Sequence, residues 1–204
     1  AYLFLVTPLA AQESFFTLLP EDSIIQVDLI TDLKKLVKGK KNPSYQEATF
    51  TFVNGPMAGK SYEIDVKPRG NMRKRICRYP PIKMKFPKTD LAFNKIKWVG
   101  VCRDNSFMKD KILSEYLAYR VYNEMTEYSF RVRLLQVSFK APKVNKTSLV
   151  ALGFIIEPLE ELGERVEAEP YEPRKVNEEL LCQEHYPLFT VFQYMIGNTD
   201  WHMS

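Results

Sequence analysis

The stretch at residues 186–202, YPLFTVFQYMIGNTDWH, combines an apolar segment with a polar turn, and the rest of the chain is organised around it. Its apolar side chains recur three and four residues apart, at Leu188, Phe192, Met195 and Ile196. This spacing predicts an amphipathic helix over residues 186–196. Pro187 suits the first turn of such a helix, and Gly197 suits its end, where a left-handed residue is often needed.

Polar side chains follow directly, on a short turn that the helix would hold rigid: Asn198, Asp200 and His202. Many active sites consist of polar groups on a loop that a packed element fixes in place. Asn and Asp are also ordinary turn and capping residues after a helix, so a purely structural turn is the alternative. His202 we interpret as a local hydrogen-bonding residue.

Length and composition indicate a globular chain. Its 204 residues can bury one sizeable core, and its contents of 45% hydrophobic and 26% charged residues are ordinary. The net charge of +4 does not by itself indicate nucleic acid. The distribution of charge says more, because residues 66–88 hold nine Lys and Arg and no acid, whereas residues 157–179 hold nine Glu and three bases. Two patches of opposite sign could steer ligands or attract each other.

The first twelve residues are an apolar run that closes on small residues, as at the end of a secretory signal peptide. This predicts export to a periplasm, the cell surface or the outside; a first strand or helix is the alternative. No stretch is long enough to span a membrane. The three cysteines form neither a disulfide framework nor a zinc pattern. If the chain is exported, Cys77 and Cys102 are the better couple, because each lies next to a predicted strand in the same half.

Alternation of apolar and polar residues predicts strands at 23–30, 46–53, 61–67, 82–86, 94–102 and 130–139, and a continuous apolar run of strand length predicts one at 150–156. The second and third form a hairpin, as do the last two. A helix is predicted over residues 107–125, with an apolar stripe at Leu113, Leu117, Val121 and Met125, joined by Tyr116. The order predicts an α+β fold, in which a mostly antiparallel sheet lobe at 13–156 precedes a hinge, an acidic connection and the start of a helical lobe at 157–204.

Two lysines share one face of the predicted strand at 82–86, because Lys83 and Lys85 are two residues apart. They either form a solvated edge that discourages aggregation or reach phosphate groups. Glu115, on the long helix, could turn toward this basic strand or face solvent.

An ordered set of segments resembles the spore-coat protein H (CotH) kinase-like family, in its exported bacterial branch. The segments are Arg69-Gly70-Asn71, residues 82–86, 114–123, 129–134, 153–157 and 197–201, and the resemblance covers roughly residues 62–204. It implies an atypical protein-kinase-like fold and the transfer of phosphate from ATP, with Mg²⁺, to a hydroxyl of a secreted or surface protein.

The resemblance also implies roles for individual residues. Arg69, Gly70 and Asn71 would stand where a loop covers the phosphates. Lys83 or Lys85 would touch the phosphates.

Three acidic residues complete the implied site. Glu115 would hold the phosphate-binding lysine in place, and Glu157 would pass through the hinge beside adenine. Asp200 would be the catalytic acid that accepts or orients the substrate hydroxyl. Such parts suit phosphoryl transfer, which depends on positioning and on neutralising charge.

Two departures from the family pattern lead to an alternative. The chain stops at Ser204, before the residues expected to hold the metal ion, so we expect an incomplete fragment that is inactive by itself. Gly70 is the sole glycine of the supposed phosphate loop. The alternative is a catalytically inactive surface module that uses its basic patch to bind acidic glycans or proteins. Nucleic-acid binding is disfavoured, because few aromatic residues interleave with the bases and because export is predicted.

Overall fold

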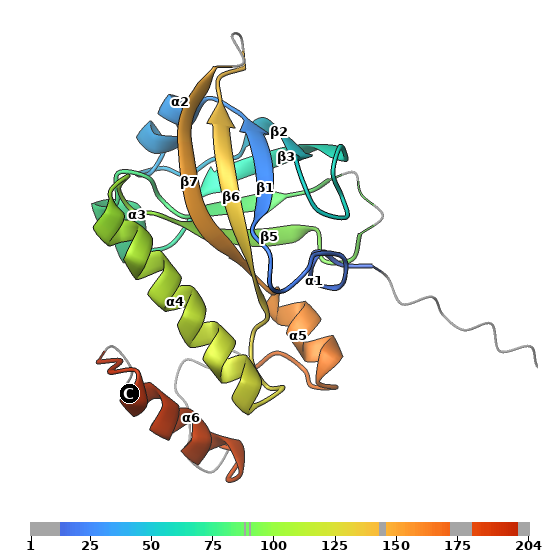
Figure 1. The fold of residues 1–204 in the computed structure, drawn as a ribbon, viewed down its shortest axis with the longest axis vertical. Coiled ribbons are helices and arrows are strands. Elements are labelled where there is room, and N and C mark those ends of the chain that lie inside the picture. The colour runs from blue at the N-terminus through green and yellow to red at the C-terminus, as the bar shows by residue number, and fades with distance from the viewer. Residues whose placement is uncertain (1–12, 88, 90, 143–145, 172–180, 200–204) are drawn as a thin grey trace, which may run out of the picture.

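The computed structural model describes residues 13–87, 89, 91–142, 146–171 and 181–199. Within these residues, seven strands close into a barrel in the order β1-β2-β3-β4-β5-β7-β6, and helices cover its outside and its ends (Figure 1). The predicted signal-peptide segment at 1–12 lies outside the described residues. No described helix has the length and apolar character needed to cross a bilayer.

The elements have the following bounds. The strands are β1 (Ile25–Ile30), β2 (Gln46–Phe52), β3 (Ser61–Pro68), β4 (Ile82–Lys85), β5 (Lys95–Gly100), β6 (Val132–Lys140) and β7 (Thr147–Ile156). The helices are α1 (Phe15–Leu18), α2 (Leu33–Lys38), α3 (Met72–Ile76), α4 (Ser106–Met125), α5 (Leu159–Arg165) and α6 (His185–Met195).

The predicted fold class, an α+β protein-kinase-like chain with a sheet lobe and the start of a helical lobe, is wrong. The sheet is a closed, mixed barrel, because the first strand returns to pair in parallel with β6, from Ile25 opposite Leu135 to Ile30 opposite Lys140. The other neighbouring strands are antiparallel, and the hairpins β2–β3 and β6–β7 are confirmed. Closure through a parallel pair more than one hundred residues apart leaves no trace in the local pattern.

Side chains fill the interior of the barrel. Alternate residues of each strand point inward, and Phe50, Phe52, Phe86 and Phe139 are each at most 2% exposed. A void of about 10 Å³ remains among Phe15, Phe50, Phe86 and their neighbours. That volume does not hold even one water molecule comfortably, so the inside of the barrel is core and not a ligand site.

The N-terminal segment closes one end of this core. Ser14 caps α1, and Phe15, Phe16 and Leu19 are buried. The guanidinium of Arg133, which is 4% exposed, donates to the carbonyls of Phe16 (2.7 Å) and Leu19 (2.8 Å). These bonds satisfy a buried cation with backbone acceptors and so fix the segment against the barrel.

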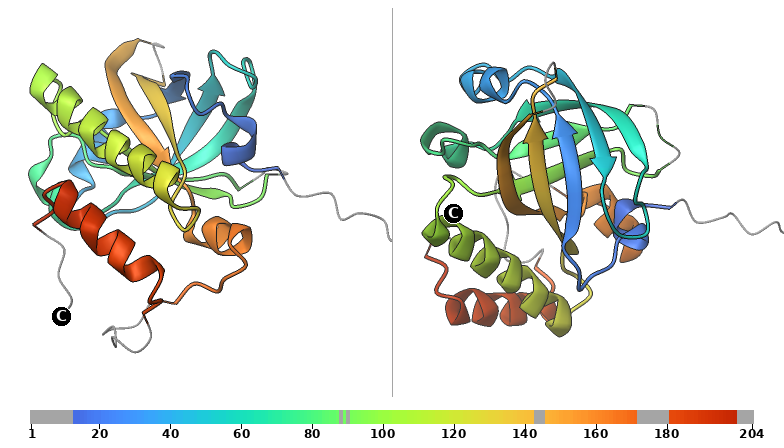
Figure 2. Two further views of the ribbon diagram at one scale, coloured as in Figure 1. Left: turned by 60° about the horizontal axis from the view of Figure 1, so that its bottom comes forward. Right: turned by 45° about the horizontal axis from the view of Figure 1, so that its top comes forward.

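Helix α4 packs on the outer face of β6 and β7, and its predicted orientation is corrected. The rings of Tyr116 and Tyr119 lie 6.1 and 5.8 Å from that of Phe154, and Ile112 is buried. Of the predicted stripe, Tyr116 is buried, but the aliphatic part faces outward, since Leu117, Val121 and Met125 are exposed. Helix α6 lies beside α4 in both views of Figure 2, with the rings of Tyr122 and Phe192 4.7 Å apart.

A disulfide joins Cys77, at the end of α3, to Cys102, just after β5, as the sequence favoured. The third cysteine, Cys182, is exposed and free. The disulfide fixes the basic segment around α3 to the barrel close to the start of α4.

Candidate functional site

A groove lies between α4 and α6 and extends to the start of β6. Its volume is about 430 Å³, which is within the range of small-molecule sites. Aromatic rings form much of its wall, at Tyr119, Tyr122, Tyr128, Phe130, Phe189 and Phe192. Polar side chains are interspersed, at Glu115, Ser129, Gln193 and Asn198.

A basic loop adjoins Glu115 and Tyr119, which line this groove. Arg73 of α3 donates to the carboxylate of Glu115 over 2.9 Å and to the carbonyl of Gly100 over 3.4 Å. The chain reaches α3 through Gly70, whose φ of 85° belongs to the left-handed region and whose missing Cβ leaves open space around it. Asn71 stands at the start of α3 without a side-chain capping bond.

Electrostatics at this loop favour an anionic ligand. Burial lowers the pKa of Arg69, and nearby Arg73 lowers it further, whereas Tyr119 opposes the shift. Burial and then the Glu115 carboxylate raise the pKa of Tyr119, which keeps its phenol neutral and able to donate a hydrogen bond. Of these two guanidinium groups, Arg73 is ion-paired with Glu115, whereas Arg69 has no ion pair with an acid among the described residues. An incoming anion would relieve the repulsion between the two cations.

A row of lysines crosses the outer face of the barrel. Lys83 lies opposite Lys67 of β3 on one side and Lys97 of β5 on the other. Lys97 in turn lies opposite Ile156, two residues from the Phe154 that packs against Tyr119. The row thus runs toward α4 and the groove.

Of the two predicted lysines, Lys83 belongs to this row. Lys85 lies one outward position away, opposite Asp65 and Lys95. The predicted pairing of Glu115 with one of these lysines is not found: its carboxylate forms an ion pair with Arg73.

The structure places Glu157 in a structural cluster. Its side chain is fully buried and accepts from the backbone N–H of Arg131 (2.9 Å), from its Nε (2.8 Å) and from Nη2 of Arg165 (3.0 Å). The carboxylate therefore holds β6, the end of β7 and α5 together. The carboxylate is not exposed to the groove. Only the backbone of Glu157 is therefore available for the position beside adenine that the family resemblance implies.

Asp200 lies outside the described residues, and the turn that leads to it begins at the groove. Gly197 ends α6 with φ 65°, as its position predicts. The side chain of Asn198 donates to Gln193 over 2.5 Å, and both line the groove. Of the predicted site residues, Arg69 and Glu115 are therefore brought together, and the loop before Asp200 starts on the same groove.

Sequence reasoning missed Arg73 and Lys97. The signal for Lys97 was present, because Lys95-Ile96-Lys97-Trp98 has the same period of two that identified Lys83. Arg73 is one of five bases in residues 68–81, and its pairing with Glu115 depends on the short helix α3.

The described residues include no group of three His, Cys, Asp or Glu side chains placed to hold a metal ion. In comparisons with known proteins, no protein-family model, no curated protein and no solved structure matches the chain. The geometry of the groove is therefore the basis on which a function is assigned.

Proposed function

We propose that the chain binds ATP in the groove between α4 and α6 and serves the transfer of its terminal phosphate to a protein hydroxyl. The observation that carries this proposal is an aromatic hollow with two half-buried arginines next to it. The closed barrel is no obstacle, because the same chemistry occurs on unrelated folds and is decided by the site.

The aromatic wall suits the base and sugar. A hollow of about 430 Å³ can take an adenosine, and rings such as Tyr122 and Phe192 offer flat apolar faces to a purine. The amides of Gln193 and Asn198 offer donors and acceptors for the polar edges of the base and sugar.

The basic loop suits the phosphates. Arg69 and Arg73 present planar guanidinium forks that match phosphate oxygens, and Lys83 and Lys97 add mobile charges on the adjacent face of the sheet. Glu115 orients Arg73 through their ion pair. Positioned cations of this kind act on the charge that develops during phosphoryl transfer.

The acceptor side of the reaction would depend on Asp200, following the resemblance to the CotH kinase-like family. Its carboxylate would accept or orient the proton of the attacking hydroxyl. The described residues do not fit a Mg²⁺ site: Glu115 is the one carboxylate of the groove wall, and its oxygens are engaged by Arg73.

An exported protein or surface protein is the proposed acceptor. The Cys77–Cys102 disulfide supports an exported location, since such bonds persist mainly in oxidising compartments.

Thermal unfolding with MgATP tests the nucleotide site. At one hundred times its dissociation constant, a ligand stabilises by about 2.7 kcal/mol, which for this length is a rise in Tm of roughly 5 to 10 °C. Arg69→Gln should reduce the rise, whereas Arg75→Gln, which removes an exposed charge from the nearby helix α3, should leave it unchanged.

A steric pair of variants locates the ligand. Ala118 lines the groove, so Ala118→Trp should fill it and abolish the rise. The neighbouring Leu117 is exposed, and Leu117→Trp should bind normally. A wild-type protein without any rise, or a rise that survives Ala118→Trp, would refute this site. In the full-length protein, phosphate transfer to exported proteins should be lost in Asp200→Asn while nucleotide binding persists; equal transfer by that variant would refute the catalytic assignment.

A further inference from the structure

A second cationic surface lies on and after α2, away from the groove. It consists of five lysines within eight residues, Lys34, Lys35, Lys38, Lys40 and Lys41. None of the five has an ion pair with an acid among the residues that the structure describes. By contrast, several arginines of the chain do have ion pairs with acids: Arg73, Arg120, Arg131, Arg133 and Arg165. The α2 lysines therefore form a concentration of uncompensated charge.

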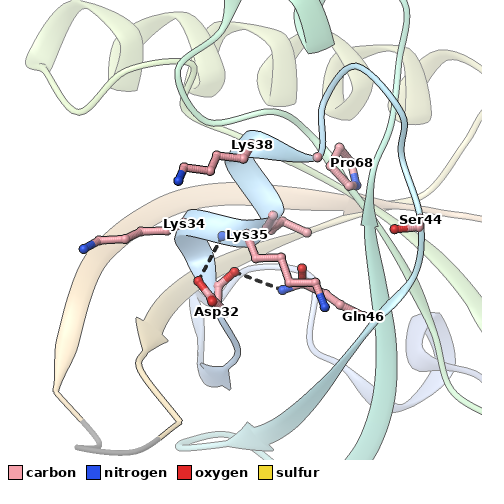
Figure 3. A pocket seen from close by; sticks show the side chains of 9 residues that line it. Asp32, Lys34, Lys35, Lys38, Ser44, Gln46 and Pro68 are labelled. Carbon is pink, nitrogen blue, oxygen red and sulfur yellow. Dashed lines mark hydrogen bonds between the residues drawn. The ribbon is translucent and has the colours of Figure 1, made fainter.

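The surface is held rigid by its surroundings. Leu36 is 1% exposed and anchors α2 in the core. Asp32 caps the helix, accepting from the N–H of Lys35 over 2.9 Å, and Gln46 donates to the carbonyl of Asp32 over 3.0 Å (Figure 3). Beyond the helix, Lys40 donates to the carbonyl of Cys77 over 2.6 Å. Little conformational entropy remains in the backbone to oppose ligand binding.

One hollow beside α2 contains Lys35 together with the acids Asp32, Glu47 and Asp65. Two other hollows flank α2, are basic, and share its lysines. One, of about 530 Å³, is lined by Lys34, Lys35, Lys38, Gln46 and Pro68 among others, and Figure 3 shows these lysine side chains extending to different sides of the helix. The other, of about 650 Å³, combines Lys34 and Lys38 with Arg78 and Tyr79. Among the described residues that line these two hollows, Asp32 is the one acid, and its carboxylate is engaged in the cap.

We propose that the α2 lysines bind a flexible linear polymer of phosphate groups, which passes over α2 from one hollow to the other. Ammonium groups on several sides of a helix suit successive anions along a bending chain, and lysine is a point charge that does not demand bidentate geometry. A flat lipid surface would meet one side of α2. A nucleic acid would call for stacking platforms, and Tyr79 is the single aromatic residue that lines the two hollows.

This site is separate from the nucleotide groove. Helix α2 lies at one end of the barrel and α6 beyond the other end in Figure 1. A test must nevertheless distinguish the two, because the lysine row of Lys67, Lys83 and Lys97 could also attract phosphate.

The test measures binding of a fluorescently labelled short-chain inorganic polyphosphate by anisotropy. The variant Lys34→Gln/Lys35→Gln/Lys38→Gln should weaken binding about tenfold or more, and binding should fall steeply with added salt. The control Lys60→Gln/Lys95→Gln/Lys111→Gln removes the same charge from exposed positions elsewhere and should weaken binding less than about twofold. An unchanged Tm in the absence of ligand verifies that each variant is folded.

Three outcomes would overturn the proposal. Equal losses in the two triple variants would assign binding to net charge. Weaker polyphosphate binding in Lys83→Gln/Lys97→Gln, with unchanged binding in the α2 variant, would assign the polymer to the lysine row next to the groove. Tighter binding, per phosphate, to single-stranded DNA or to anionic lipid vesicles would identify a different class of partner.

Discussion

At the scale of residues, the packing of Trp98 shows how closely the barrel interior is filled. A Cβ at Gly100 would lie 2.0 Å from the indole, and one at Gly153 would lie 2.5 Å from the carbonyl oxygen of Val99 and 2.7 Å from the indole. These two glycines therefore make room for one large ring, in the manner of a packed core.

Gly153→Ala should lower the free energy of unfolding by about 1 to 3 kcal/mol, because the added methyl meets backbone as well as ring atoms. Urea unfolding followed by circular dichroism measures the change. Gly39→Ala is the control, since its Cβ would meet nothing closer than 3.3 Å and its backbone is not left-handed. A fully stable Gly153→Ala protein would mean that Trp98 is packed differently.

Glu161 makes stability depend on pH. Burial raises its pKa above the ordinary 4.5 and outweighs the opposing contributions of Ser14 and Arg131. Between 4.5 and the raised pKa, the folded state binds more protons than the unfolded state, so stability is lost as the pH rises through this window. Glu161→Gln should remove that part of the slope.

The measurement is the free energy of unfolding between pH 4 and 7 in wild type, in Glu161→Gln and in Glu160→Gln, where the neighbouring side chain is exposed. Parallel slopes in all three proteins would contradict the assignment to Glu161.

Some site residues could be predicted from type and period, and others could not. Period two correctly put Lys83 and Lys85 on one face of β4, and the structure shows that it is the less buried face. The burial of Glu157 could not be predicted, because it depends on Arg131 and on Arg165, and Arg165 is carried by a helix, α5, in the segment predicted as an acidic connection. The local sequence around a charged residue does not predict which distant arginine will form an ion pair with it.

At the scale of elements, the disulfide joins α3 to the end of β5 across 25 residues. Cys77→Ser/Cys102→Ser should cost about 3.5 kcal/mol by the loop-entropy estimate, or roughly 7 to 14 °C in Tm. Cys182→Ser, at an exposed free thiol, should leave the Tm unchanged. A dithiol reductant that fails to lower the Tm of wild type would indicate that the disulfide contributes little.

Helix α4 illustrates what an apolar pattern predicts and what it leaves open. Its extent was predicted to within one residue, because helical spacing is a local property. Asp104, Asn105 and Ser106 are all possible caps by residue type, and Asn105 is the one that caps the helix. Its orientation was wrong: the tyrosines face the barrel and the aliphatic stripe faces outward. Which of two apolar faces is buried depends on the partner, here Phe154 of β7, and not on the helix itself.

At the scale of the whole molecule, the parallel pairing of β1 with β6 turns an open sheet into a barrel. Single strands and hairpins were predictable from alternation and turn residues. Closure was not, because it brings together segments from opposite halves of the chain, and either segment alone reads as an ordinary half-buried strand.

Hydrogen exchange should reveal the resulting hierarchy of stability. Amides of β1 and β6 should share the slowest exchange, since both belong to the closed ladder. Amides of α6 should exchange much faster, because only two of the described residues of this helix, Phe192 and Gln193, are buried. Equal protection of α6 and β6, measured by mass spectrometry of peptides, would show that α6 is an integral part of the cooperative unit.

The enclosed indole of Trp98 also gives the protein a built-in optical probe. At 3% exposure it is shielded from water, so its emission should lie at short wavelength in the native protein and shift to the red when the strands separate. The chain has one other tryptophan, Trp201, so Trp201→Phe would leave a single fluorophore. Its signal would then follow the opening of the barrel in real time, without any attached dye.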